Sequence, residues 1–188
     1  MKKIRTKLDG VYIIEPHVYG DHRGFFMESY NLQEFKELGI EHHFVQDNHS
    51  LSVQAGTIRG LHYQLNPKAQ TKLVRVLSGA VYDVVVDIRI GSPTFGEWAG
   101  VILSEENKRQ ILIPQGFAHG ICTLVNNTQI MYKVDEFYSP KHDRGIYWND
   151  PLLEIAWPVA DPILSEKDKN LPLLENAENN FLFKEGLW

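Results

Sequence analysis

Short extended segments separated by turn residues recur along the chain, and this pattern constrains the fold more than any other feature. The segments "GVYIIEP", "FFMESY", "WAGVILS", "RQILIP", "HGICTLV" and "TQIMYKVDEFY" are all typical of strands. In "TKLVRVLSGAVYDVVVDIR" the second half alternates, with Val81, Asp83 and Val85 on one face, and Ser78-Gly79 predicts a hairpin between the two halves. Many short strands at roughly regular spacing indicate an all-β sandwich or barrel.

Helices are expected at only two places. In "NLQEFKELG", residues 31–39, Asn31 is the predicted N-cap, Glu34 follows three residues later and Gly39 ends the segment. In "LSEKDKNLPLLENA", Ser165 is the predicted N-cap and Pro172 limits the helix to a turn or two. The fold prediction is therefore all-β with a few short peripheral helices.

The sequence contains no Gly/Ser tract, charge block or internal repeat that would divide its 188 residues. We therefore expect a single domain over residues 1–188, with an N-terminal strand extension and a short C-terminal helical segment. The net charge of -5 argues against a nucleic-acid partner, and no uncharged apolar stretch reaches membrane length. The basic N-terminus lacks the apolar run of a signal peptide, and the single cysteine, Cys122, suits a reducing compartment. These features predict a cytoplasmic protein with neither nucleic acid nor membrane as a partner.

Two histidine-containing segments resemble the signature of the cupin family, which is a β-jelly roll. "GTIRGLHYQ" resembles the first half, G-x5-H-x-H-x3/4-E, and "PQGFAHG" resembles the second half, P-x-G-x2-H. His62 and His119 match, whereas Gln64 stands at the second histidine position and no acidic residue stands at the glutamate position. Zinc, iron and manganese sites generally need three or four protein ligands. The resemblance therefore predicts a cupin-type jelly roll without a metal or other cofactor, although a lone strand histidine is more often structural.

A longer series of segments resembles one family of this fold. In order, these are "GDHRGFFMESY", "FVQDNHS", "IRGLHYQ", "QTKLVRVLSGAVYDVVVDIR", "SPTFGEW", "NKRQILIPQGFAHGICTL" and "YSPKHDRGIYWND". Together they resemble the dTDP-4-dehydrorhamnose 3,5-epimerase family from about Gly10 to about Leu174. The resemblance implies an isomerase that inverts C3 and C5 of dTDP-4-dehydro-6-deoxy-D-glucose to give dTDP-4-dehydro-L-rhamnose. It also implies a homodimer in which some N-terminal contacts cross to the second subunit.

The reaction needs a base beside a ketone, a group that stabilises the enolate oxygen and an acid on the opposite face of the sugar. The resemblance assigns His62 as the base, with Asp168 holding its other ring nitrogen, as in other His–Asp pairs. It assigns Tyr132 as the acid and Lys72 as the enolate stabiliser. Each residue also has an ordinary structural role open to it. Asp168 suits a helix N-terminus, Tyr132 suits strand packing, and Lys72 can reach water from a strand end.

The resemblance also implies a binding site for the nucleotide diphosphate. The resemblance implies that Arg59 and Arg23 bind the diphosphate, because guanidinium groups fit phosphate oxygens. On simple alternation Arg59 and His62 point to opposite faces, and a bulge at Gly60 would bring both to one cavity. The remaining predicted substrate contacts are Phe25, Glu28, Gln46, Asp47, Asn48, His119, Tyr138, Asp143 and Lys167.

Alternative functions remain open at this level. The arginines and aromatic residues also fit a cupin that binds a nucleotide sugar without chemistry. The local sequence does not exclude an epimerase that acts at one carbon only, or on another nucleotide sugar. A metal-dependent cupin oxygenase is a third class, against which Gln64 argues.

Overall fold

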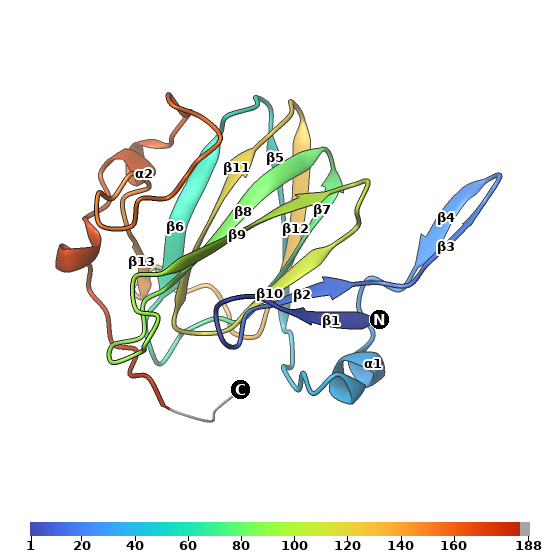
Figure 1. The fold of residues 1–188 in the computed structure, drawn as a ribbon, viewed down its shortest axis with the longest axis horizontal. Coiled ribbons are helices and arrows are strands. Elements are labelled where there is room, and N and C mark those ends of the chain that lie inside the picture. The colour runs from blue at the N-terminus through green and yellow to red at the C-terminus, as the bar shows by residue number, and fades with distance from the viewer. Residues whose placement is uncertain (185–188) are drawn as a thin grey trace.

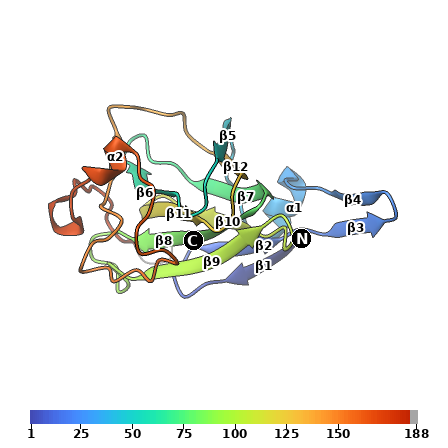
Figure 2. The same cartoon turned by 90° about the horizontal axis from the view of Figure 1, so that it is seen from above.

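The computed structural model describes residues 1–184, so the predicted domain boundary at residue 188 lies outside the described residues. Within this range two antiparallel sheets face each other as a β-sandwich, shown in Figures 1 and 2. The six-stranded sheet has the order β1 (Lys2–Arg5), β2 (Tyr12–Glu15), β10 (Gln110–Ile113), β7 (Lys72–Ser78), β12 (Thr128–Val134) and β5 (Gln46–Ser52). The five-stranded sheet has the order β13 (Asp143–Gly145), β6 (Ile58–Gln64), β11 (Phe117–Thr123), β8 (Ala80–Asp87) and β9 (Trp98–Ser104).

A separate hairpin extends from the sandwich. It consists of β3 (Val18–Asp21) and β4 (Gly24–Met27) and projects far from the body in Figure 1. In both views it lies at the opposite end of the molecule from α2 (Glu166–Lys169). All four residues of β3 are exposed, so the hairpin has little contact with its own sandwich.

The helices are short and peripheral, as predicted. They are α1 (Leu32–Glu37), α2 and a 3-10 turn, η1 (Leu174–Asn176). The Asn31 side chain accepts hydrogen bonds from the backbone N–H groups of residues 33 and 34, and the Ser165 side chain accepts one from Asp168, so both predicted N-caps are confirmed. No helix within residues 1–184 is long and apolar enough to cross a membrane.

The main core fills the space between the sheets. Val74 and Val76 of β7 pack against Val81 and Val85 of β8, and all four are at most 3% exposed. Because side chains alternate along a strand, these rows of valines define the inner faces of the two sheets. A second cluster lies on the outer face of the five-stranded sheet, and Phe35 of α1 covers part of the outer face of the six-stranded sheet.

The hairpin predicted at Ser78-Gly79 is wrong. β7 pairs with β10 and β12, whereas β8 pairs with β9 and β11, so the chain crosses from one sheet to the other at this point. Gly79 adopts φ +83°, and a Cβ there would lie 2.6 Å from the Thr128 hydroxyl oxygen. The crossing lets both valine rows share one core, and this burial outweighs the hydrogen bonds that a local hairpin would form.

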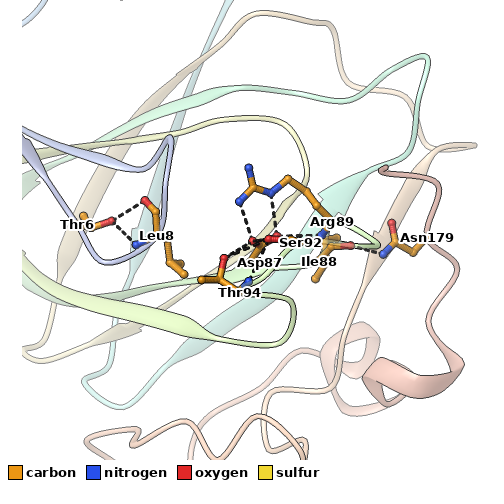
Figure 3. Close-up of polar contacts among 8 residues, drawn as sticks. All are labelled: Thr6, Leu8, Asp87, Ile88, Arg89, Ser92, Thr94 and Asn179. Atoms are coloured by element: carbon orange, nitrogen blue, oxygen red, sulfur yellow. Dashed lines mark hydrogen bonds and ion pairs between the residues drawn. The ribbon is translucent and has the colours of Figure 1, made fainter. Parts of the chain in front are cut away.

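A buried polar cluster closes the end of β8, as Figure 3 shows. The Asp87 carboxylate accepts two hydrogen bonds from the Arg89 guanidinium, at 2.9 and 2.7 Å, and one each from Ser92 and Thr94. Burial raises the pKa of Asp87, but these hydrogen bonds outweigh it and hold the pKa below its usual value. Asn179 donates to the neighbouring Ile88 carbonyl and so fixes the C-terminal segment beside this cluster.

Candidate active site

A cavity of about 380 Å³ lies between the two sheets. The five-stranded sheet contributes one wall through β6 and β11, and the six-stranded sheet contributes the facing wall through β7 and β12. Residues 163–168 close one side. Its apolar base, which includes Val74, Ile121 and Ile130, is continuous with the main core. The polar residues that project into this cavity therefore belong to strand faces whose other side chains are apolar.

Gly60 explains how Arg59 and His62 both reach this cavity. His62 is the register partner of His119, whereas Arg59 is that of Ile121, so three steps along β6 match two along β11. This irregularity inverts the alternation between residues 59 and 62. Gly60 has φ +140°, and a Cβ there would lie 2.5 Å from the Gly120 Cα. The predicted break in alternation is thus present, and only glycine fits it.

His62 and Asp168 form a close pair at one side of the cavity. The distance from His62 Nε2 to Asp168 Oδ1 is 2.6 Å, and the Asp168 side chain is only 4% exposed. Burial raises the pKa of this carboxyl, but the hydrogen bond and charge of His62 outweigh it, with help from Ser165, and the pKa is lowered overall. Asp168 therefore stays ionised and can accept the Nε2 proton, so Nδ1 is the ring nitrogen that is directed away from the carboxylate and is available to a bound molecule.

Lys72 stands in the apolar row of β7, on the facing wall. Its ammonium donates to the His62 carbonyl at 3.3 Å. Burial lowers the pKa of Lys72 to about 8, while Asp143 and Asp83 act in the opposite direction and Lys167 adds to the lowering. The ammonium is therefore charged at neutral pH, yet poorly solvated, which strengthens its interaction with a developing anion.

Tyr132 lines the same wall from β12, beside Val74, its register partner on β7. Burial raises the pKa of Tyr132, against the opposing effect of Arg59, so the phenol keeps its proton at neutral pH. Within residues 1–184 its hydroxyl makes no hydrogen bond to another residue, and it is therefore available to a bound molecule.

A polar group surrounds the mouth of the cavity. Arg59 donates to the Ser52 hydroxyl at 3.0 Å, which anchors its guanidinium beside β5. Asp143 accepts from Lys167 at 2.5 Å and from the Tyr138 hydroxyl at 3.1 Å. Arg59 and Lys167 line the cavity, whereas Tyr138 is 56% exposed and lies outside it. The mouth thus presents two cations and an accessible aromatic ring.

The cavity brings together part of the predicted site. It is lined by Arg59, His62, Lys72, His119, Tyr132, Lys167 and Asp168. Gln46 and Asn48 belong to the inner side of β5, where their side chains are hydrogen-bonded to each other at 2.9 Å. Asp47 points to the outer side instead and forms an ion pair with Lys133 at 2.9 Å.

The three predicted N-terminal contacts do not line this chain's cavity. Arg23 is at the tip of the β3–β4 hairpin, where it pairs with Asp21, and Phe25 is 58% exposed beneath Lys108. Glu28 follows the hairpin and accepts a hydrogen bond from Asn31. Their separation from the cavity means that a single chain does not assemble the whole predicted set.

Asp83 is a fully buried residue directly behind the cavity-lining His119, and sequence reasoning did not select it. It lies on β8 between the buried valines 81 and 85, and its Oδ2 is 2.9 Å from Nε2 of His119. The signal was the acidic residue within an alternating apolar row, where burial of a charge requires a reason.

Gln64 has a structural role where a cupin would have a metal ligand. Its amide donates to the Lys68 and Phe137 carbonyls, and its oxygen accepts from the Ser139 N–H at 2.7 Å. Among residues 1–184, no three His, Cys, Asp or Glu side chains are grouped so as to hold a metal ion. The metal-free chemistry itself stays a prediction.

The fold and site together define a cupin-type β-sandwich in which the two cupin histidines each contact a carboxylate. The family model of dTDP-4-dehydrorhamnose 3,5-epimerase matches residues 5–176. A relative of that name from Shigella flexneri is 56% identical over 171 residues, covering 90% of this chain and 94% of the relative. The chain belongs to the dTDP-4-dehydrorhamnose 3,5-epimerase family, and it is an isomerase.

Solved structures agree with this assignment. The enzyme of this name from Bacillus anthracis, with TDP and PPi bound, has a TM-score of 0.90 and 60% identity, covering 92% of this chain and 98% of that one. The dTDP-6-deoxy-D-glucose-3,5-epimerase of Legionella pneumophila, in complex with dTDP-4-keto-L-rhamnose, has a TM-score of 0.89 and 51% identity, covering 93% of each chain. The predictions of family and of cupin-type fold are thereby confirmed.

Proposed function

We propose that this chain inverts C3 and C5 of dTDP-4-dehydro-6-deoxy-D-glucose, giving dTDP-4-dehydro-L-rhamnose, by proton transfer through an enolate without a metal. The observation that carries the mechanism is that His62 and Tyr132 line one cavity from opposite sheets. A base on one side of a sugar ring and an acid on the other are what inversion requires.

The base in this proposal is His62. Its neutral imidazole takes the proton from the carbon beside the ketone, and the electrons of that C–H bond form the enolate. Asp168 holds the ring orientation and stabilises the imidazolium that results, as the 2.6 Å contact supports. The Lys72 ammonium stabilises the enolate oxygen.

The acid is Tyr132, which returns a proton to the same carbon from the opposite face. After one inversion the imidazole holds one proton more and the phenol one fewer, and exchange with solvent restores both. The positions of His62 and Tyr132 on facing walls, together with the buried ammonium of Lys72, support this order of events.

The diphosphate binds in this proposal at the mouth, where Arg59 and Lys167 lie. His119 contacts the hexose from the cavity wall. Gln46, Asn48, Tyr138 and Asp143 belong to the nucleotide end of the site, with the Tyr138 ring as a stacking surface, whereas the Asp47 side chain stays with Lys133 on the outer side of β5.

A homodimer completes the site in our proposal. The β3–β4 hairpin projects from the sandwich at the end opposite α2 (Figures 1 and 2). It carries Arg23 and Phe25, which do not line this chain's cavity, and in the proposal a second copy receives it. The hairpin's large exposed side chains include Tyr19 and Phe26, at 61% and 67%. Burial of these residues against a partner would bring Arg23 and Glu28 to the partner's cavity. We further propose a cytoplasmic location, consistent with the single, buried Cys122.

Isotope exchange tests the chemistry. Purified, chelator-treated protein is incubated with the substrate in heavy water, and NMR follows deuterium at each sugar carbon. Incorporation at C3 and C5 supports the proposal, whereas incorporation at one carbon identifies a single-site epimerase. Tight binding of the nucleotide sugar without exchange identifies a binding protein, and loss of exchange after chelation excludes the metal-free mechanism.

Two variants separate the acid from the base. His62→Ala should lose most exchange, and an unchanged rate would remove His62 from this role. Tyr132→Phe should reduce inversion more than the initial loss of hydrogen, because deprotonation does not require the phenol.

A further inference from the structure

A second histidine–carboxylate pair lies directly across from the first. His119 on β11 is the register partner of His62 on β6, so the two imidazoles are neighbours on the inner face of one sheet. Each has its Nε2 against a carboxylate, His62 with Asp168 at 2.6 Å and His119 with Asp83 at 2.9 Å. The mechanism above uses the first pair and leaves the Asp83 carboxylate without a purpose.

Asp83 is buried at a cost that packing does not explain. It is 0% exposed, and within the described residues its Oδ1 has no hydrogen-bond partner. A valine would fit the row that Val81 and Val85 form on the same face. An ionised carboxylate with only one satisfied oxygen is unfavourable there unless its charge has a use.

The facing wall supplies a use for this charge. Burial of Lys72 in the cavity lowers the pKa of its ammonium, and Asp83 is one of the two carboxylates that act against this lowering. The other is Asp143, which Lys167 already neutralises in part through a 2.5 Å ion pair. The charged and titratable groups around Lys72 are His62 and Arg59 from β6, His119 from β11, Asp83 from β8, Tyr132 from β12, Asp143 from β13, and Lys167 and Asp168 from the α2 segment. β9 and β10 contribute none to this region.

We propose that Asp83 is a positioning residue of the proton-transfer site, which fixes the tautomer of His119 and supplies the buried negative charge that keeps the Lys72 ammonium protonated. By accepting the Nε2 proton, Asp83 leaves Nδ1 of His119 to accept a hydrogen bond from a sugar hydroxyl. Asp83 belongs to the inner row of β8, which packs against the inner row of β7 that includes Lys72, and from there its charge balances a cation that the enolate neutralises only during the reaction. The inference rests on the function proposed above, because Lys72 matters only if an enolate forms.

A titration of Lys72 tests the inference without relying on catalysis. The protein is labelled with carbon-13 at the lysine Cε, and the Lys72 resonance is assigned by its loss in Lys72→Arg. Its chemical shift then reports the pH at which half of the Lys72 ammonium groups are deprotonated. The wild-type midpoint is expected near 8. In Asp83→Asn it should fall by about one pH unit, because an opposite charge nearby has been removed. Glu15→Gln is the matched control, since it removes a carboxylate that pairs with Arg109 at 2.8 Å on the outside of the sandwich.

The outcomes are distinct. A folded Asp83→Asn protein with an unchanged Lys72 midpoint overturns the inference, as does an equal shift in Glu15→Gln. If Asp83→Asn does not fold, nitrogen-15 spectra of the wild type decide instead, because the inference requires His119 to be protonated at Nε2 across the working pH range. A wild type that shows these titrations but no isotope exchange refutes the proposed function and leaves the Asp83 interactions intact. In an active enzyme the alkaline limb of the exchange rate should move with the Lys72 midpoint.

Discussion

Replacement of Asp168 by asparagine tests the proposed base in isolation. Asparagine preserves the shape of the side chain and removes its charge. In the wild type the backbone N–H of residue 168 donates to the Ser165 hydroxyl at 3.1 Å. The substitution leaves this hydrogen bond, and therefore the cap of α2, in place. The His62 imidazole, however, loses the carboxylate that orients it and stabilises its protonated form.

The expected size of the effect follows from the geometry. The His62–Asp168 hydrogen bond is 2.6 Å long and the carboxylate is 4% exposed, so solvent screens it little. A hydrogen bond to a charged group contributes about 1.5–3 kcal/mol. Since about 1.4 kcal/mol corresponds to a tenfold change in rate, exchange in Asp168→Asn should be about 10- to 150-fold slower than in the wild type.

The assay is the initial rate of deuterium incorporation into saturating substrate, measured by mass spectrometry at neutral pH. Glu166→Gln is the matched control because it removes an exposed carboxylate from the same short helix, where it pairs with Lys169 at 2.6 Å. Its rate should stay within about twofold of the wild type. A folded Asp168→Asn variant that exchanges at the wild-type rate refutes the dyad, and an equal loss in both variants assigns the effect to the helix charge.

Three further perturbations address other parts of the molecule. The exchange rate should fall as pH rises through about 8, because Lys72 loses its proton there, and Lys72→Arg should abolish this limb; a limb that persists in the variant contradicts the assignment. Gly60→Ala should lower the free energy of unfolding, measured by chemical denaturation, by about 2–4 kcal/mol, because the added Cβ would lie 2.5 Å from a backbone atom of β11. Gly20→Ala, whose added Cβ would make only an ordinary 3.7 Å contact, should have little effect. Arg89→Met should lower the free energy of unfolding by about 3–5 kcal/mol, because it removes the cation that pairs with the buried Asp87 carboxylate. Arg109→Met, which breaks the partly exposed ion pair with Glu15, should lower it by about 1 kcal/mol or less. Equal losses in the two variants would show that burial does not set the difference.

Local sequence was sufficient for most of the strand positions and for both helix caps. Alternation and turn residues identified most strands, and the side chains of Asn31 and Ser165 cap the helices as predicted. The same signals failed at Gly79, where a sheet-to-sheet crossing has the local appearance of a hairpin. The difference depends on which distant strands pair with each half, and that information is not local.

The site was predictable to the extent that it depends on motifs. The segments around His62 and His119 matched the two halves of the cupin signature, and the structure makes these residues register partners. Asp83 was missed because its significance depends on the histidine beside it in space, 36 positions later in the chain. The N-terminal contacts illustrate the opposite limit, since the family resemblance named Arg23 as a substrate contact and the structure places it on an exposed hairpin that does not line this chain's cavity.

The contact between His62 and Asp168 spans 106 positions of sequence. All thirteen described strands precede Asp168 in the chain, so under the proposed mechanism a chain that has formed its sandwich but not this contact still lacks the partner of its base. Under that mechanism, the start of turnover would report the moment at which residues 163–168 take their place along one side of the cavity.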